Sequence, residues 1–175
     1  MSRVVASEPP HIPNNGDERV LLLAFLQFYR AALLDRAAGL DAEQLRRPLA
    51  PSRLTLIGLI GHMTYVEYIW FRTRLTGEAM PEVYDTLDWD ADRDAEMTRA
   101  EAMAPEAVVA EYRAAVREAD DRIAAADLDT VSVERPDGEE PWDVRWIVIH
   151  MIEEYARHCG HADIIRESID GGVAS

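Results

Sequence analysis

The sequence contains no lysine, because all 18 of its basic residues are arginines. Enzymes that form a Schiff base, including those that use pyridoxal phosphate, and proteins with a Walker-type phosphate loop need a lysine at the reacting or phosphate-binding position. These classes are therefore excluded. The chain also has a single cysteine, Cys159, which cannot form an internal disulfide bond.

Long hydrophobic runs are missing as well. No stretch of about 18 uninterrupted apolar residues is present, which argues against a membrane span. No apolar segment of signal-peptide length precedes the first predicted helix. Together with the single cysteine, these features lead us to expect a cytoplasmic protein.

Positive charge is scarce relative to negative charge. The chain has 33 acidic and 18 basic residues, a formal net charge of −15. Such a charge repels phosphate backbones and anionic lipid surfaces, so we expect neither a nucleic acid nor a membrane as partner. A length of 175 residues with 48% hydrophobic residues is typical of one soluble domain.

Capping residues and helical periodicity divide the chain into four long predicted helices. Asp17, Thr55 and Asp143 are suited to cap helix N-termini, and Pro105 is suited to the first position of a helix. Apolar residues then recur with the helical period. The predicted helices span 18–38, 56–74, 105–126 and 144–169.

The segments between these helices predict an all-α fold. Residues 1–16 are expected to form an extended N-terminal arm with His11 exposed, and 41–44 a short helix. Residues 78–104 are interpreted as a long surface connection with a short helical stretch near 90–99. Residues 129–142 are predicted to be an extended connection or small hairpin that turns at 136–138. The pattern favours one domain over 17–175, a four-helix bundle with long crossover connections.

The stretch "HMIEEYARHCGH" in the last predicted helix carries the candidate chemistry. Glu154 and His158 are one turn apart, a spacing that lets two side chains of one helix ligate a single metal ion. Glu153 points about 100° away from Glu154 and is expected to be solvated or paired with Arg157. Four side chains share one face, a sector of about 80°: His150, Glu154, His158 and His161.

A third ligand is available on another helix. His62 shares a stripe with apolar residues of the second predicted helix and should face inward. With Glu154 and His158 it would form a two-histidine, one-glutamate set suited to Zn²⁺ or another divalent ion, with a further coordination position open. His150 and His161 are candidates for support or substrate contact. A buried core histidine at 62, and a polar role for His161 near the end of the bundle, are the alternatives.

Other side chains near this stretch have simpler interpretations. Four residues could line a substrate pocket beside the metal, although aromatic residues at helical spacing more often belong to a core: Tyr65, Ile69, Trp142 and Trp146. Cys159 follows His158 but points about 100° away from it, so we expect a buried and unreactive thiol.

The two segments "LTLIGLIGHMTYVEYIWF" and "VRWIVIHMIEEYARHCGHADIIRESIDG" resemble the DinB-like metalloprotein superfamily, in particular its actinobacterial branch related to mycothiol-dependent maleylpyruvate isomerases and mycothiol S-transferases. The resemblance extends over nearly the whole chain from about residue 17. It implies a bundle that holds a divalent metal ion between its second and fourth helices, with His62, Glu154 and His158 as ligands.

The resemblance also implies a function. It predicts a metal-dependent S-transferase in which a low-molecular-weight thiol such as mycothiol binds the open metal position as thiolate and attacks an electrophile. Zinc is the expected ion. Nickel, iron and manganese are alternatives, because Glu154 replaces a histidine found in other members. Isomerase activity is less expected, since the chain lacks the C-terminal domain of the maleylpyruvate isomerases.

Two further interpretations stand beside the enzyme. The chain could be a metal-binding bundle without turnover that has a stress-related or interaction role. Its broadly apolar first helix could also support a homodimer.

Overall fold

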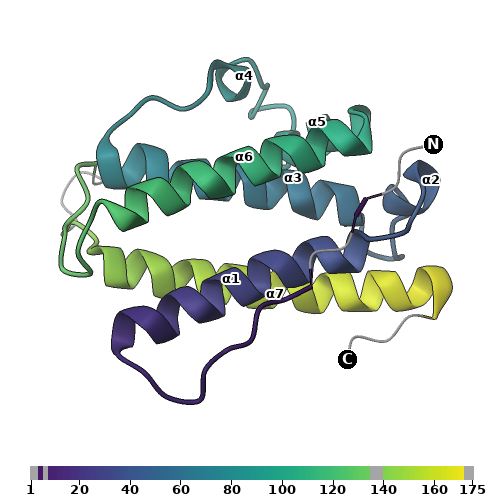
Figure 1. Ribbon diagram of the computed structural model, residues 1–175. Coiled ribbons are helices and arrows are strands. Elements are labelled where there is room, and N and C mark those ends of the chain that lie inside the picture. The colour runs from purple at the N-terminus through teal and green to yellow at the C-terminus, as the bar shows by residue number, and fades with distance from the viewer. Residues whose placement is uncertain (1–3, 6–7, 135–139, 172–175) are drawn as a thin grey trace.

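Four long helical segments dominate the structure, a computed structural model that describes residues 4–5, 8–134 and 140–171 (Figure 1). No strand occurs within these residues, so the predicted all-α class is confirmed. The long segments are α1 (Glu18–Ala37), α3 (Leu56–Glu67) with its continuation η1 (Tyr68–Arg74), α6 (Pro105–Ala124) and α7 (Val144–Asp170).

The long helices begin where the capping residues predicted. The side chains of Asp17, Thr55 and Asp143 accept hydrogen bonds from the backbone N–H groups of the first turns of α1, α3 and α7. Pro105 is the first residue of α6. These short-range contacts satisfy N–H groups that lack a partner within the helix, and so they fix each starting residue.

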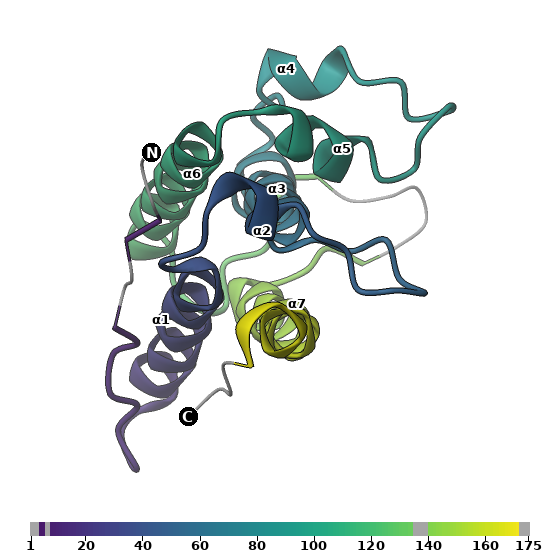
Figure 2. The same ribbon diagram turned by 90° about the vertical axis from the view of Figure 1, so that its right-hand side faces the viewer.

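The long segments run alongside one another around a shared core, which Figure 2 shows nearly end-on. α7 packs against α1 and α3, and α3 packs against α6. α3 and α7 therefore lie side by side, with α6 against α3 and α1 against α7. Fully buried core side chains include Leu26, Leu33, Ile57, Ile60, Ile147 and Met151.

Three short helices lie in the connections. The Asp41 side chain caps α2 (Ala42–Leu45), and the Gln44 side chain in turn accepts a hydrogen bond from the Asp41 N–H, so a short helix begins here as predicted. α4 (Glu82–Asp85) was not predicted. α5 (Ala95–Ala102) begins five residues later than the stretch predicted near 90–99, and it packs against α3. The interpretation of 78–104 as a surface connection is thus wrong for α5, whose Glu96 and Ala100 are buried.

The second long helix changes its winding in the middle. A single α-helix was predicted as far as Arg74, but α3 ends at Glu67 and η1 continues as a π-helix. A π-helix bonds each N–H to the fifth preceding carbonyl, so it fits more residues into a turn and shifts the side chains that follow. π-Helical segments are frequent at functional sites.

The remaining segments contain little regular structure. His11 is exposed as expected, and the Val4 carbonyl accepts a hydrogen bond from Gly39 N–H at 3.1 Å. Val131 and Asp143 form an isolated antiparallel bridge, while the predicted turn at 136–138 lies outside the described residues. None of the described helices is long and apolar enough to cross a bilayer. The division into arm and domain, the cytoplasmic location and the homodimer stay predictions.

Candidate metal centre

α3 and α7 bring the three predicted ligands together. One potential ligand atom from each of His62, Glu154 and His158 lies within 4.8 Å of the other two. The rings of His62 and His158 have centroids 4.8 Å apart, and His158 Nε2 lies 3.4 Å from Glu154 Oε2. We refer to these three residues as the candidate metal centre.

The candidate metal centre lies at the edge of the core. The side chains of His62, Glu154 and His158 are 21%, 15% and 11% exposed, so the cluster is neither sealed nor fully solvated. Glu154 and His158 face the same way because they are one helical turn apart on α7. His62 completes the cluster because α3 packs directly against α7.

The imidazole of His158 presents a free lone pair at neutral pH. The pKa of His158 is lowered to about 4, first by burial and then by the neighbouring His62. Its Nδ1 lies 3.4 Å from Nδ1 of His161, which leaves Nε2 facing Glu154. His161 thus contacts His158 at the ring nitrogen that does not face Glu154.

Charged neighbours surround Glu154. Arg157 Nη1 donates a hydrogen bond to Glu154 Oε1 at 3.2 Å, and Arg157 also pairs with Glu153. The predicted pairing of Glu153 with Arg157 is therefore confirmed. This arrangement leaves Glu154 Oε2 directed toward His158.

A second group of potential ligands shares Glu154. His150 Nδ1 lies 3.6 Å from Glu153 Oε2, and His150 Nε2 lies 3.9 Å from Glu154 Oε1. The Glu153 side chain is 50% exposed and already paired with Arg157. This second group therefore has the character of an ordinary solvated helix face, and the candidate metal centre is the better candidate for a metal site.

Tryptophan rings surround His150. Trp146 stacks on His150 with centroids 5.1 Å apart and an interplanar angle of 14°, and Trp70 meets His150 edge-on at 4.6 Å. Trp142 contacts Trp70 at 5.2 Å. Trp146 is 44% exposed and so is not a core residue, whereas Trp142 is half-buried and packs against the core. Trp70, which the π-helix η1 supplies, was not singled out from the sequence.

Tyr65 belongs to a different aromatic group. Its ring lies 5.1 Å from Tyr84 and 5.0 Å from Trp89, both in the connection between η1 and α5. Burial and the nearby negative charge of Glu96 raise the pKa of Tyr65. Among the described residues, no hydrogen bond, ion pair or ring contact joins Tyr65 to His62, Glu154 or His158.

Glu96 of α5 is a contact of the site that the sequence did not reveal. Its Oε1 lies 2.8 Å from Nδ1 of His62, and the residue is only 5% exposed. The interpretation of 78–104 as a surface connection gave no reason to seek a buried acid there. The pattern of apolar residues in 78–104 gave no other indication of a buried acid.

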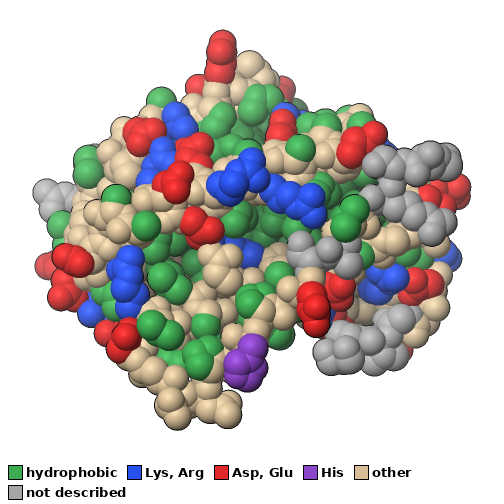
Figure 3. All heavy atoms as spheres, viewed as in Figure 1, with side chains coloured by type: hydrophobic (Ala, Val, Ile, Leu, Met, Phe, Trp, Pro, Cys, Tyr) green, Lys and Arg blue, Asp and Glu red, His purple; other side chains and the backbone are tan. Residues whose placement is uncertain are grey.

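A separate hollow lies on the face formed by α1 and α6. Figure 3 shows arginine side chains gathered over α6 on this face. The hollow has a volume of about 260 Å³, and Arg30, Tyr112 and Arg113 are among its lining residues. None of the candidate ligands lines it, so it is distinct from the candidate metal centre.

Comparison with known proteins identifies the family. The family model described as mycothiol-S-transferase matches residues 21–171. A search of curated proteins found no match. The predicted resemblance and the predicted transferase class are therefore confirmed, and the family match does not support the alternative of a bundle without turnover. The chain belongs to the mycothiol-S-transferase family, a DinB-like family of transferase enzymes that use mycothiol as co-substrate.

Proposed function

We propose that this chain is a metal-dependent mycothiol S-transferase whose divalent ion is held by His62, Glu154 and His158. The ion would lie between the second and fourth long helices of a DinB-like bundle, with zinc expected and nickel, iron or manganese as alternatives. One observation carries the proposal, namely the convergence of the three ligand atoms within 4.8 Å.

The donor chemistry of the three residues fits a divalent cation. Two imidazole nitrogens and one carboxylate oxygen form a ligand set used at catalytic zinc sites. The low pKa of His158 keeps its ring neutral, as a metal ligand requires. Mutual hydrogen bonding does not explain the cluster, because the 3.4 Å separation of His158 Nε2 and Glu154 Oε2 is longer than a good hydrogen bond.

The net reaction balances without an oxidant or reductant. The thiol sulfur forms a bond to the electrophilic carbon, the leaving group departs with the electron pair of the broken bond, and the thiol proton passes to solvent. When bound, a divalent ion lowers the pKa of a coordinated thiol, so that it is a thiolate at neutral pH. The protein's own part is to hold the three ligands and to present the rings of Trp70, Trp146 and His150 beside Glu154 to the reactants.

Metal analysis of purified variants tests the ligand set. Protein prepared without chelator should carry close to one divalent ion per chain, and His62→Ala or His158→Ala should lose it. His11→Ala is a matched control, because His11 is exposed and distant in sequence from both ligand segments. His150→Ala distinguishes the candidate metal centre from the second group of potential ligands that shares Glu154, because we expect this variant to retain the ion. Full occupancy in both His62→Ala and His158→Ala would overturn the site.

An activity assay tests the metal dependence. Consumption of mycothiol in the presence of a haloalkyl electrophile should require metal, and a chelator followed by readdition of Zn²⁺ should abolish and restore it. Bacillithiol and glutathione serve as comparison thiols. Unchanged turnover in metal-free protein would leave the family assignment standing and overturn the role of the metal.

A further inference from the structure

The α5 helix brings a buried carboxylate to the back of a candidate ligand. Glu96 Oε1 lies 2.8 Å from Nδ1 of His62, whereas Glu96 Oε2 has no hydrogen-bond partner among the described residues. We propose that Glu96 is a positioning residue: it holds the proton of His62 on Nδ1 and thereby leaves Nε2 as the nitrogen that binds the metal ion. The inference rests on the proposed metal-dependent function.

The energetics of burial fix the direction of this hydrogen bond. A carboxylate removed from water is costly unless it accepts hydrogen bonds, and here the imidazole is its one side-chain partner in the described structure. With Glu96 as the carboxylate, the 2.8 Å contact places a proton on Nδ1 of His62. A neutral imidazole with its proton on Nδ1 has its lone pair on Nε2, on the opposite side of the ring.

The packing of α3 against α5 makes the contact possible. At Gly61, next to His62, an added Cβ would lie 2.3 Å from Cβ of Ala100 and 3.2 Å from the Glu96 carbonyl oxygen. Only a glycine lets the two helices approach this closely. Gly61 thus allows α5 to pack close enough to α3 for Glu96 to reach the ring of His62, although Glu96 is 34 residues away along the chain.

A hydrogen bond of this kind affects metal binding in two ways. It restricts the ring to one orientation and one tautomer, and it increases electron donation from the ligating nitrogen. Loss of such a partner typically weakens metal affinity by about 10- to 100-fold. Glu96 would therefore act through His62, without contacting either the ion or the thiol.

The test compares Glu96→Leu, Glu96→Gln and Glu101→Gln. Glu101 is a matched control, because it is on the same helix and also accepts a hydrogen bond from α3, from Thr55 Oγ1 at 2.6 Å, but touches no candidate ligand. Zn²⁺ affinity is measured by competition with a chelator. We expect a loss of about 10- to 100-fold in Glu96→Leu, a smaller loss in Glu96→Gln, and none in Glu101→Gln.

Nitrogen NMR of metal-free protein provides a readout that does not need the ion. His62 should carry its proton on Nδ1 in the wild type and in Glu96→Gln, whose amide oxygen still accepts the bond, and should change toward Nε2 in Glu96→Leu. Circular dichroism checks that each variant folds. If Glu96→Leu does not fold, the wild-type tautomer and the Zn²⁺ affinity of Glu96→Gln decide the question.

The outcomes separate this inference from the proposed function. A wild-type His62 with its proton on Nε2, or wild-type Zn²⁺ affinity in a folded Glu96→Leu protein, overturns the role of Glu96 and leaves the metal site intact. Failure of the wild-type protein to bind any divalent ion overturns the proposed function instead.

Discussion

α3 and α7 build two polar clusters that differ in how their charges are balanced. The first is the core network, which consists of Arg30, Glu67, Tyr112, Asp120 and Tyr155. Both oxygens of Glu67 accept hydrogen bonds from Arg30, at 2.7 and 2.6 Å, and Oε1 also accepts one from the Tyr155 hydroxyl at 2.6 Å. Asp120 accepts a further bond from Arg30 at 2.7 Å. Every charge in this network has a partner supplied by the protein.

The candidate metal centre has the opposite character. His62, Glu154 and His158 each bring one potential ligand atom within 4.8 Å of the other two, and no hydrogen bond between these three side chains occurs in the described structure. Glu154 and Tyr155 are neighbours in sequence, yet Tyr155 is fully buried in the core network. α3 and α7 thus contribute both to a structural cluster whose charges the protein itself balances and to a neighbouring group of potential ligands whose charge, in the function proposed above, an added cation would balance.

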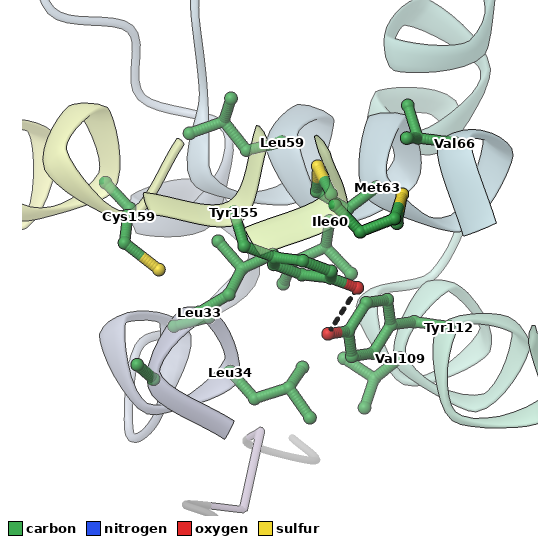
Figure 4. Packing of buried hydrophobic residues seen from close by; sticks show 14 of the residues in the cluster. Leu33, Leu34, Leu59, Ile60, Met63, Val66, Val109, Tyr112, Tyr155 and Cys159 are labelled. Carbon is green, nitrogen blue, oxygen red and sulfur yellow. Dashed lines mark hydrogen bonds between the residues drawn. The ribbon is translucent and has the colours of Figure 1, made fainter. Parts of the chain in front are cut away.

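Figure 4 shows the two tyrosines of the core network, Tyr112 and Tyr155, with their hydroxyls turned toward each other. The hydroxyls of Tyr112 and Tyr155 are 3.0 Å apart, and the two rings come from α6 and α7. Because Tyr155 donates its proton to Glu67, it accepts from Tyr112. The network therefore connects α1, α3, α6 and α7 through the middle of the core.

Breaking the core network should have the largest effect on stability. Glu67→Gln removes the more deeply buried of the two carboxylates that pair with the buried Arg30, and turns an amide NH₂ toward the guanidinium. We expect the free energy of unfolding, measured by urea titration of metal-free protein, to fall by about 3–5 kcal/mol. Glu118→Gln is the matched control, because Glu118 pairs with Arg72 and Arg122 in a more exposed position and should cost about 1 kcal/mol or less.

Urea titration of metal-free His62→Ala protein tests whether the candidate metal centre contributes less to stability than the core network does. If His62 serves the metal ion and not the fold, its loss should change the metal-free stability far less than Glu67→Gln does. Equal destabilisation by the two variants would show that both clusters are structural.

Alkaline pH should weaken the core network by an intermediate amount. Burial, followed by the charge of Glu67, raises the pKa of both Tyr112 and Tyr155 above the ordinary value of 10. Above pH of about 10 the unfolded chain loses protons that the folded chain keeps, so the stabilisation is complete below this pH and is lost as the pH rises. The expected loss is about 1.4 kcal/mol per pH unit for each tyrosine.

Unfolding titrations from about pH 8 to about pH 11 would measure this slope. Tyr155→Phe should reduce the slope, because it removes one of the two core-network tyrosines whose pKa burial raises. A wild-type protein whose tyrosines all ionise near pH 10 while it stays folded would contradict the prediction.

Local patterns predicted much of the fold and two of the site contacts. Helix starts at Asp17, Thr55 and Asp143 depend on hydrogen bonds within three residues, which the sequence displays directly. The pairing of Glu154 with His158 depends only on the helical repeat. The meeting of His62 with His158 followed from the apolar stripe around His62, which had to face another helix.

Contacts between distant segments could not be predicted in this way. Glu96 reaches His62 only because α5 packs on α3 at Gly61, and the acidic composition of 78–104 suggested solvent. Arg30 and Glu67 lie in helices expected to be apolar, and no pattern in either segment indicates that these two residues pair. The π-helical winding of η1 has no local sequence signal that we recognise, so Trp70 was missed.

The smallest effect is expected at Cys159, which marks the boundary between the two regions. Cys159 follows His158 in sequence but points toward α1, where its Sγ lies 3.6 Å from the Tyr29 carbonyl oxygen (Figure 4). The residue is 4% exposed, and burial raises the pKa of its thiol to about 12. A thiol that stays protonated is a poor nucleophile and a poor metal ligand. Native protein should therefore resist alkylation until it is unfolded, and Cys159→Ala should retain both its metal content and its transferase activity. Rapid labelling of the folded chain, or loss of the ion in Cys159→Ala, would mean that the site extends past His158 into the core.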